Sequence, residues 1–395
     1  MVFRQVISVL MLLAIMLTMA LAGCSGSGAV SAPTQTSSVT PTPSLTSTPA
    51  TTLPTTTMPA TTTIPATTPA TTTTPATTKI PATTPTGKVS ILSHSSYIKH
   101  GKWTGLFSGE VYEGDFLHIV GEIQNDGQVN VKDFEMAAVY FDANGTTLPI
   151  TGRIYLDESP ELLTPGEKGP FLLILFDEAT SQKVSSYQLS IEFSTTAEQP
   201  YLLNITGDRD YTDKWGIYQV LGEVENAGES NIESVRIFAT FYDEDGRVID
   251  MDFTFTSLDN VVPGQKSPFQ LWPNRGNDVK SIVKGYSLRA QCRVVDKEVY
   301  RGFQILGDTS RIGTLQDYIV AGQIKNTGDQ DATFVKIVAT FYRADNTVAT
   351  IDFTFSDPID LKAGDTGQFE LSTYPYELAP GEIVRYSLEF ECANY

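Results

Sequence analysis

The sequence predicts an all-β protein made of three tandem β-sandwiches that follow a disordered Thr/Pro-rich stalk. Three observations predict this architecture. One short motif recurs about every 100 residues, which is the size of a domain. After each copy of the motif, apolar and polar residues alternate in short runs, as in half-buried strands. The chain before the first copy is dominated by Thr and Pro, a composition that cannot build a packed core.

The charge of the chain excludes several classes of partner. Its 395 residues contain 27 Lys and Arg against 46 Asp and Glu, a formal net charge of -19. Residues 1–87 contain only Arg4 and Lys79 as charged side chains, so the acidic excess lies in the remainder. Such a surface repels nucleic acid and anionic membrane surfaces. We therefore expect no nucleic-acid partner and interpret the excess as an aid to solubility.

Residues 1–23 have the layout of a secretory signal. Arg4 precedes the apolar run Val6–Leu17, which is too short to span a membrane and is followed by small residues. The tetrad Leu21-Ala22-Gly23-Cys24 resembles the lipobox of prokaryotic lipoproteins, bacterial or archaeal. This resemblance implies cleavage before Cys24, lipidation of its thiol, and a lipid-anchored place on the extracytoplasmic face of the cell membrane. An ordinary signal peptide or an uncleaved anchor is the alternative.

Residues 24–87 carry the lipidated Cys24 and the predicted stalk. Runs such as Pro65-Ala66-Thr67-Thr68-Pro69-Ala70 bury too little apolar surface to offset the entropy of ordering. Repeated Pro favours extended polyproline II, and dense Thr with Pro is typical of O-glycosylated stalks. An unmodified flexible linker is the alternative. Either form holds the folded part away from the membrane.

Three copies of a strand-end motif mark three domains. The motif reads Gly121-Glu122-Ile123-Gln124-Asn125-Asp126-Gly127 in the first copy and recurs at 222–228 and 322–328. In its Asn-x-Gly turn we expect the Asn to bond local backbone and the Gly to take a positive φ. The alternating strand that follows carries large apolar residues at every second position: Phe134, Met136, Ala138 and Tyr140, then Val235, Ile237, Ala239 and Phe241, then Val335, Ile337, Ala339 and Phe341.

Later landmarks also recur in each copy. A Pro-Gly or Ala-Gly turn precedes a Phe by five residues, at Phe171, Phe269 and Phe369. A last alternating strand begins at Tyr187, Tyr286 and Tyr386. Six or seven short strands per copy, without helical periodicity, indicate small sandwiches of immunoglobulin-like type. We place the three domains at 88–198, 199–298 and 299–395, with short linkers that limit flexing.

The strand that ends in Tyr-Asp carries a family resemblance. Phe238-Ala239-Thr240-Phe241-Tyr242-Asp243 and its third-copy counterpart at 338–343 look like the FxLYD family of extracytoplasmic immunoglobulin-like domains. The first copy departs further, with Ala137-Ala138-Val139-Tyr140-Phe141-Asp142. The resemblance rests on packing and turn positions, and it implies a fold and a surface location. It supplies no catalytic residues.

The sequence offers little site chemistry. Cys292 and Cys392 occupy equivalent places in consecutive domains, so we expect buried core thiols, not a disulfide. His94 and His100 are six residues apart, a spacing that suits no common metal pair. We therefore expect scattered surface positions for these two and for His118, with a zinc site as the alternative. We found no phosphate loop, serine elbow or Cys-His pairing in the sequence. We therefore predict that the protein is not an enzyme and has no metal or other cofactor.

Two further kinds of motif each have two interpretations. The turn Asp243-Glu244-Asp245-Gly246 offers oxygens for calcium, and a polar hairpin turn explains it equally well. Asn144 and Asn204 begin Asn-x-Thr acceptor patterns for N-glycosylation, which would make the chain a glycoprotein. Without a glycosylation pathway they are only turn and strand residues.

The predicted role is a non-catalytic surface lipoprotein whose tandem domains serve protein interaction, adhesion or envelope structure. Sandwich modules commonly bind through end loops or strand edges. The loops best placed for this lie around Asp126, Ala227 and Thr327 and at the hairpin tips Asn144, Asp245 and Asp345. The alternative is a lipoprotein that binds carbohydrate or a small ligand and assists a transporter or wall polymer. Trp103, Trp215 and Trp272 would stack on a sugar, although we expect them to pack in cores.

Overall fold

A computed structural model describes residues 86–104, 111–149, 154–155, 160–213, 215–314, 316–373 and 381–393. Residues 79–395 form one compact unit. The predicted signal peptide, Cys24 and nearly all of the predicted stalk lie outside the described residues. In the described part of the chain, no helix has the length and apolar character needed to cross a bilayer.

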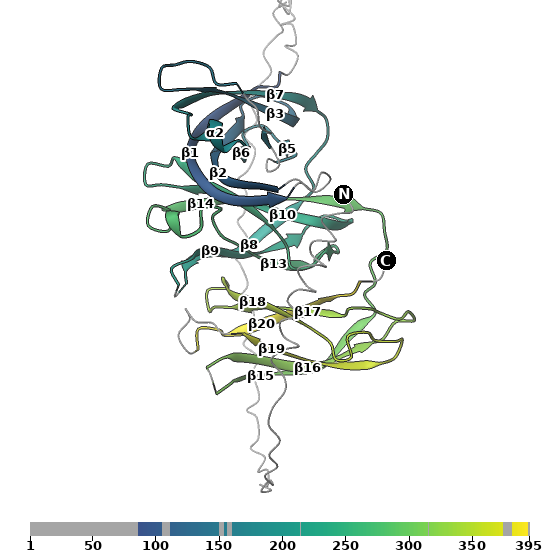
Figure 1. The fold of residues 1–395 in the computed structure, drawn as a ribbon. Helices are drawn as coiled ribbons and strands as arrows, with labels where there is room; N and C mark the ends of the chain where they lie inside the picture. Colours follow the sequence, from purple (N-terminus) through teal and green to yellow (C-terminus); the bar gives the residue numbers. More distant parts are fainter. Residues whose placement is uncertain are drawn as a thin grey trace, which may run out of the picture. The chain divides into compact units, whose positions relative to one another are not determined.

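The described residues confirm the all-β prediction of three tandem immunoglobulin-like sandwiches (Figure 1). Each sandwich packs two small antiparallel sheets around its own apolar core. The inward positions predicted for the first alternating strand are buried in all three copies. Residues of the last strand, such as Leu189, Leu288 and Leu388, are half-buried and pack against the same cores.

The first sandwich contains two sheets and a short helix. One sheet has the order β1-β2-β6-β4. Its strands are β1 (Val89–Thr104), β2 (Val111–Asn125), β6 (Lys168–Leu175) and β4 (Ile154–Tyr155). The other sheet, β5-β3-β7, contains β5 (Leu162–Leu163), β3 (Asn130–Phe141) and β7 (Ser186–Thr196). The helix α2 (Glu178–Ser181), which the sequence did not predict, starts where the Asp177 carboxylate accepts the Thr180 N–H.

The second sandwich repeats this plan with one change. One sheet, β13-β9-β8, contains β13 (Lys266–Leu271), β9 (Tyr218–Asn226) and β8 (Leu203–Thr212). The other sheet is built on β10 (Asn231–Tyr242), with β11 (Val248–Phe255), β12 (Asn260–Val261) and β14 (Gly285–Val295). A 3-10 turn, η1 (Gly276–Val279), follows β13. Here the strand after the hairpin, β11, pairs with β10, whereas β4 pairs with β6 in the first sandwich.

The third sandwich follows the second closely. One sheet has the order β15-β16-β19, with β15 (Phe303–Ile312), β16 (Tyr318–Asn326) and β19 (Thr366–Thr373). The other has the order β18-β17-β20, with β18 (Val348–Phe355), β17 (Lys336–Tyr342) and β20 (Arg385–Glu391).

The recurring Gly and Phe landmarks have one packing reason. Gly121, Gly222 and Gly322 each lie opposite a Phe on the neighbouring strand, namely Phe171, Phe269 and Phe369. A Cβ at Gly121 would come within 2.4 Å of the Phe171 ring, and the other two copies are similarly tight. The ring therefore occupies the space that a side chain would take, and the core closes over the glycine.

The Asn of each motif bonds the backbone of the following turn, as predicted, and also ties that turn to the sandwich. Asn226 is fully buried, and its amide donates to Ser230 O at 2.9 Å and Val261 O at 2.8 Å. Its Oδ1 accepts the Gly228 N–H at 3.1 Å. The expected positive φ of this Gly is wrong, because none of the motif's turn glycines adopts one. Gly228 is required instead for close approach, since a Cβ would meet the Tyr201 ring at 2.2 Å.

Each sandwich begins and ends beside this turn. Val89 at the start of β1 pairs with Asn125, and Thr196 at the end of β7 pairs with Asn130. The second and third copies have the same arrangement. The hairpin tips that follow β3, β10 and β17 consequently lie at the opposite end of each sandwich, roughly 40 Å away along a 12-residue strand.

Candidate functional site

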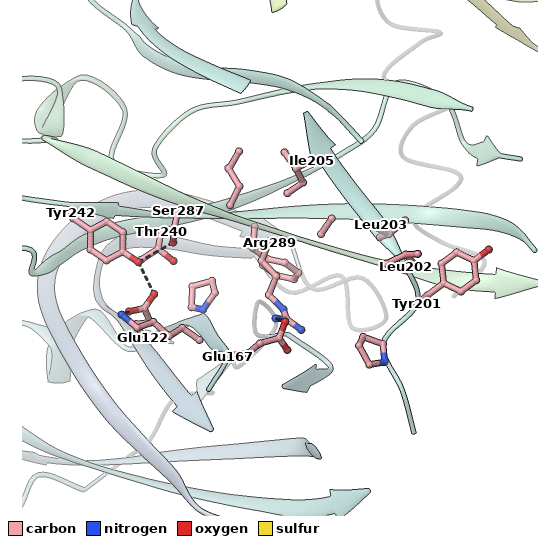
Figure 2. Close-up of a pocket in the computed structure, with 16 residues that line it drawn as sticks. Glu122, Glu167, Tyr201, Leu202, Leu203, Ile205, Thr240, Tyr242, Ser287 and Arg289 are labelled. Atoms are coloured by element: carbon pink, nitrogen blue, oxygen red, sulfur yellow. Dashed lines mark hydrogen bonds and ion pairs between the residues drawn. The ribbon is translucent and has the colours of Figure 1, made fainter. Parts of the chain in front are cut away.

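The most distinctive polar site joins the first and second sandwiches. Tyr242, the last residue of β10, donates its hydroxyl to Glu122 Oε1 of β2 at 2.6 Å and lies 2.9 Å from Ser287 Oγ (Figure 2). Glu122 is only 3% exposed. Burial, followed by the hydrogen bond to Glu122, raises the pKa of Tyr242 to about 12, so the phenol keeps its proton. We call this contact the Tyr–Glu–Ser contact.

The same contact joins the second and third sandwiches. Tyr342 donates to Glu223 Oε1 at 2.7 Å and lies 3.0 Å from Ser387 Oγ. Tyr342 and Glu223 are both buried, and burial raises the pKa of Tyr342 to about 12. Both tyrosines occupy the same strand-end position, before Asp243 in the second copy and Arg343 in the third, and both glutamates follow the motif glycine. Neighbouring sandwiches therefore stack through one repeated interface.

Apolar residues surround each contact. At the first junction, Val120 and Leu172 of one sandwich pack with Phe238, Val248 and Met251 of the next. At the second junction the apolar cluster is smaller and contains Leu221, Tyr342 and Val348. Arg209 reinforces this second junction because its guanidinium donates to Val348 O and Ala349 O, both at 2.6 Å.

A cleft of 660 Å³ opens beside the first contact (Figure 2). The linker residues Tyr201 and Leu202 form one part of its lining, and β14 contributes Arg289. Arg289 forms an ion pair with Glu167 at 2.9 Å, and Glu122 forms one with Lys168 at 3.3 Å. Each charge in the cleft thus has an opposite partner, so the arrangement is suited to joining two sandwiches and not to selecting a charged ligand.

At the second junction, side chains hold the corresponding region together. Arg301 of the linker donates to Phe390 O at 2.6 Å and also to Gln265 Oε1. Gln265 in turn donates to Glu389 Oε2 at 2.7 Å. Glu391 accepts the Asp259 N–H at 2.8 Å and pairs with Lys336 at 3.1 Å. The two junctions thus share the Tyr–Glu–Ser contact but differ beside it.

A buried acid network completes the first junction. Asp250 is fully buried and accepts the Tyr97 hydroxyl at 3.0 Å and the Arg275 N–H at 2.7 Å. The Arg275 guanidinium lies 4.7 Å from the Tyr97 ring centre. Burial raises the pKa of Asp250 to about 6. Burial and then the neighbouring Asp250 charge raise the pKa of Asp252 to about 7.

The structure corrects one expectation about histidine. His94 and His100 are exposed, as predicted. His118 is not on the surface: it is fully buried and stacks on Tyr97, with ring centres 5.2 Å apart. Burial lowers its pKa to about 4, so it is neutral in the fold. The strand pattern assigns His118 to the outward face of β2, and that face is covered by the second sandwich.

The expectation that the tryptophans pack in cores is wrong for two of them. Trp215 is 63% exposed and Trp272 is 49% exposed, while the Trp103 side chain lies outside the described residues. Trp272 borders a groove of 380 Å³ together with Ile217, Gln219 and Gln270. Gln219 is held by Asp213, whose Oδ2 accepts its amide at 2.8 Å. An exposed indole beside ordered amides is suited to a polar ring ligand.

The two cysteines of the described residues are not joined by a disulfide. Cys292 and Cys392 are half-buried and pack against the cores of their own sandwiches. Burial raises the pKa of the Cys292 thiol to about 12, which suppresses the reactive thiolate.

The predicted interaction loops fall into two separate groups. Asp126 lies in the turn after β2, where it pairs with Lys88 at 3.6 Å. Asn144, Asp245 and Asp345 are exposed at hairpin tips, which lie at the other end of each sandwich. Asn204, the other glycosylation candidate, is exposed on β8. The structure therefore does not bring Asp126 together with the hairpin tips of its own sandwich.

The hairpin carboxylates support their own turns. Asp243 Oδ1 accepts the N–H groups of Asp245 and Arg247 at 3.0 and 2.9 Å. Among the described residues, no three His, Cys, Asp or Glu side chains are grouped as metal ligands would be. The prediction that the chain acts without calcium or another cofactor remains a prediction.

The interface residues were not identified from the sequence. Tyr242, Glu122 and Ser287 lie far apart along the chain, and each belongs to a strand whose pattern is explained by packing alone. One signal was present: the Glu after the motif glycine is Gln323 in the last copy, and the Tyr of the strand end is Phe141 in the first. Comparison with models of known protein families and with curated proteins finds no match for the chain.

Proposed function

We propose that the chain is a non-catalytic, lipid-anchored surface protein that presents a stack of three immunoglobulin-like sandwiches for protein interaction, adhesion or envelope structure. The observation that carries this proposal is the repeated Tyr–Glu–Ser contact, through which the second sandwich stacks on the first and the third on the second. Buried polar groups here serve assembly within the chain.

The anchor and the location rest on the sequence. The lipobox-like tetrad ending at Cys24 and the Thr/Pro-rich stalk support a position of the stack outside the cell, at a distance from the membrane. The resemblance to FxLYD domains agrees with this location. In the proposed arrangement the stalk enters at the start of β1, beside the turn that contains Asp126. The hairpin tip at Asn144 then lies at the other end of the first sandwich, and the tips at Asp245 and Asp345 lie at the ends of their own sandwiches opposite the motif turn.

Cell fractionation tests the anchor. The wild-type chain is expected in the detergent phase after membrane extraction, and the Cys24→Ser variant is expected to lose its lipid and leave that phase. External protease should remove the sandwiches from intact cells that carry the wild type. Retention of the variant in the detergent phase would contradict lipidation at Cys24.

Cross-linking on intact cells tests the role. Affinity recovery of the full chain followed by mass spectrometry should return one recurring surface protein, with cross-links in the loops of the stack. Recovery of wall polymer alone would contradict a protein-interaction role and favour envelope structure or glycan binding.

The exposed tryptophans favour one second candidate, carbohydrate binding. Trp272, Gln219 and Gln270 together offer a flat apolar ring and hydrogen-bonding amides. Titration of the full chain with envelope glycans should quench tryptophan fluorescence, and Trp272→Ala should abolish the response. Trp215→Ala is the matched control outside the groove lining. An unchanged spectrum with every glycan would exclude this candidate.

A further inference from the structure

Each junction is made by two different faces. We define the acceptor face as the outer face of the sheet that carries the motif strand, centred on Val120 and Glu122 in the first sandwich. The donor face is the outer face of the sheet that carries the Tyr-Asp strand, centred on Phe238 and Tyr242 in the second. The interface is therefore head-to-tail, with different surfaces meeting at each step.

The middle sandwich uses both faces, each in contact with a neighbouring sandwich. Its donor face meets the first sandwich through Tyr242, and its acceptor face meets the third through Leu221 and Glu223. Leu221 is fully buried and Glu223 is 3% exposed, although both lie on the outside of their own sheet. A stack of such units would continue to add copies, because a head-to-tail contact leaves one face of each kind open.

The acceptor face of the third sandwich has lost the residues that make the contact. Ala321 and Gln323 occupy the register positions of Leu221 and Glu223, and Gln323 is exposed. Across the same face, Arg311 pairs with Glu370 at 3.2 Å, and both side chains are more than half exposed. In the first sandwich the corresponding positions hold Tyr97 and Leu172, which pack in the first junction.

The donor face of the first sandwich also lacks the residues that make the contact. Phe141 takes the register position of Tyr242 and has no hydroxyl to donate, and Gln188 takes that of Ser287. Ala137 takes the position of Phe238 and is exposed. Glu135 lies directly opposite Glu192 on this face, so two like charges would have to be buried by a docked sandwich.

We propose that these substitutions end the stack at three sandwiches and prevent a second copy of the chain from adding to either end. Both free faces differ from their internal counterparts in related ways. Phe141 lacks the donor hydroxyl and Gln323 replaces the acceptor carboxylate by a neutral amide, apolar side chains shrink at Ala137 and Ala321, and charges appear where contact would bury them. Exposed charge on a surface that would otherwise pair is a recognised device against unwanted assembly. The restored faces would fit one kind of partner, another sandwich of this chain.

Restoring the two faces in separate chains tests the proposal. One variant carries Ala321→Leu, Gln323→Glu and Glu370→Leu, and the other carries Ala137→Phe, Phe141→Tyr and Gln188→Ser. Both are made in the full chain, purified in detergent and examined by sedimentation velocity. The wild type and each variant alone should remain monomeric. Their mixture should form 1:1 dimers with an affinity at least about tenfold above that of the wild type.

Two outcomes would overturn the proposal. One is a wild-type chain that dimerises with cross-links between its first and third sandwiches. The other is a mixture of variants that stays monomeric although circular dichroism shows both to be folded.

A converse experiment keeps the proposal falsifiable if a restored variant fails to fold. Leu221→Ala with Glu223→Gln transfers the third copy's residues to the middle sandwich. Loss of docking should raise the rate of proteolysis in the linker at 296–302 by about tenfold or more, in line with a larger open population. A linker as resistant as in the wild type would show that these positions do not decide stacking.

Discussion

Removal of the Tyr342 hydroxyl tests the energetic weight of the stacking contact. In Tyr342→Phe the ring stays in place, but Glu223 loses a donor at 2.7 Å while remaining 3% exposed. A hydrogen bond to a charged group contributes about 1.5 to 3 kcal/mol, and a buried carboxylate left without its donor is costly. We therefore expect the free energy of opening at the second junction to fall by about 2 kcal/mol.

Hydrogen exchange by mass spectrometry measures this quantity in the full chain. Peptides from β9 and β17, which carry the two partners, should exchange about 30 times faster in the variant, since 1.4 kcal/mol corresponds to a factor of ten. Peptides from β3, in the first sandwich, should be unchanged. Tyr242→Phe should speed exchange in the same way in peptides from β2 and β10, which carry Glu122 and Tyr242.

Two control variants test whether the Tyr342 hydroxyl holds the second junction. Phe141→Tyr adds the same hydroxyl to the corresponding place on the uncovered sheet face of the first sandwich, so its effect should stay below about 0.5 kcal/mol. In the Tyr342→Phe background, Glu223→Gln removes the buried charge and should restore part of the loss. If Tyr342→Phe changes exchange no more than Phe141→Tyr does, the hydroxyl does not hold the junction.

Three other predictions concern stability. Asn226→Ala removes a buried amide with three hydrogen bonds and should lower the urea midpoint by an amount equivalent to about 2 to 4 kcal/mol, whereas Asn204→Ala on the exposed β8 position should be nearly neutral. Burial raises the pKa of Asp250 to about 6 and of Asp252 to about 7, so between about pH 4 and 7 these groups keep protons that they lose on unfolding. Their contribution to the unfolding free energy is therefore greatest below pH 4 and is lost as the pH rises to 7, while the lowered pKa of His118 acts in the opposite direction between about pH 4 and 6.5. Urea titrations at pH 7.5 and 4.5 should show that acidification stabilises Asp252→Asn less than it stabilises the wild type, because the variant lacks the Asp252 contribution. A greater gain in unfolding free energy in the variant would contradict this assignment. Calcium at millimolar concentration should leave the melting temperature unchanged, because Asp243 already accepts two backbone N–H groups; a rise of several degrees would establish a calcium site.

The sequence was sufficient to predict the cores but not the interfaces between them. Alternating residues such as Ile237 and Phe241 predict a buried face directly, because a strand shows its two faces at a period of two. The local backbone bonding of Asn226 was also predictable, since its spacing to Gly228 defines a turn. Both inferences depend on neighbours within one copy.

Stacking residues are invisible to that pattern because they lie on the polar side of each strand. Glu122 and Glu223 have the spacing of solvent-facing residues, yet the next sandwich buries them. His118 was misplaced for the same reason. The burial of these positions depends on contacts more than 100 residues away, such as that from Tyr242 to Glu122, and no local periodicity encodes them. The exposed Trp272 shows the reverse case, in which a large apolar residue is left exposed beside a groove of its own sandwich.

The two complete faces of the middle sandwich determine how a gene for this chain could change its length. An in-frame duplication of residues 199–298 would insert a unit that carries both Tyr242 and Glu223, so the added junction would keep the Tyr–Glu–Ser contact without a compensating substitution. A duplicated first unit would place Phe141 and Glu135 inside the stack, and a duplicated third unit would bury Gln323 and the Arg311–Glu370 pair. Length variation that preserves folding should therefore enter through the middle copy, and longer natural versions should resemble it in every added repeat.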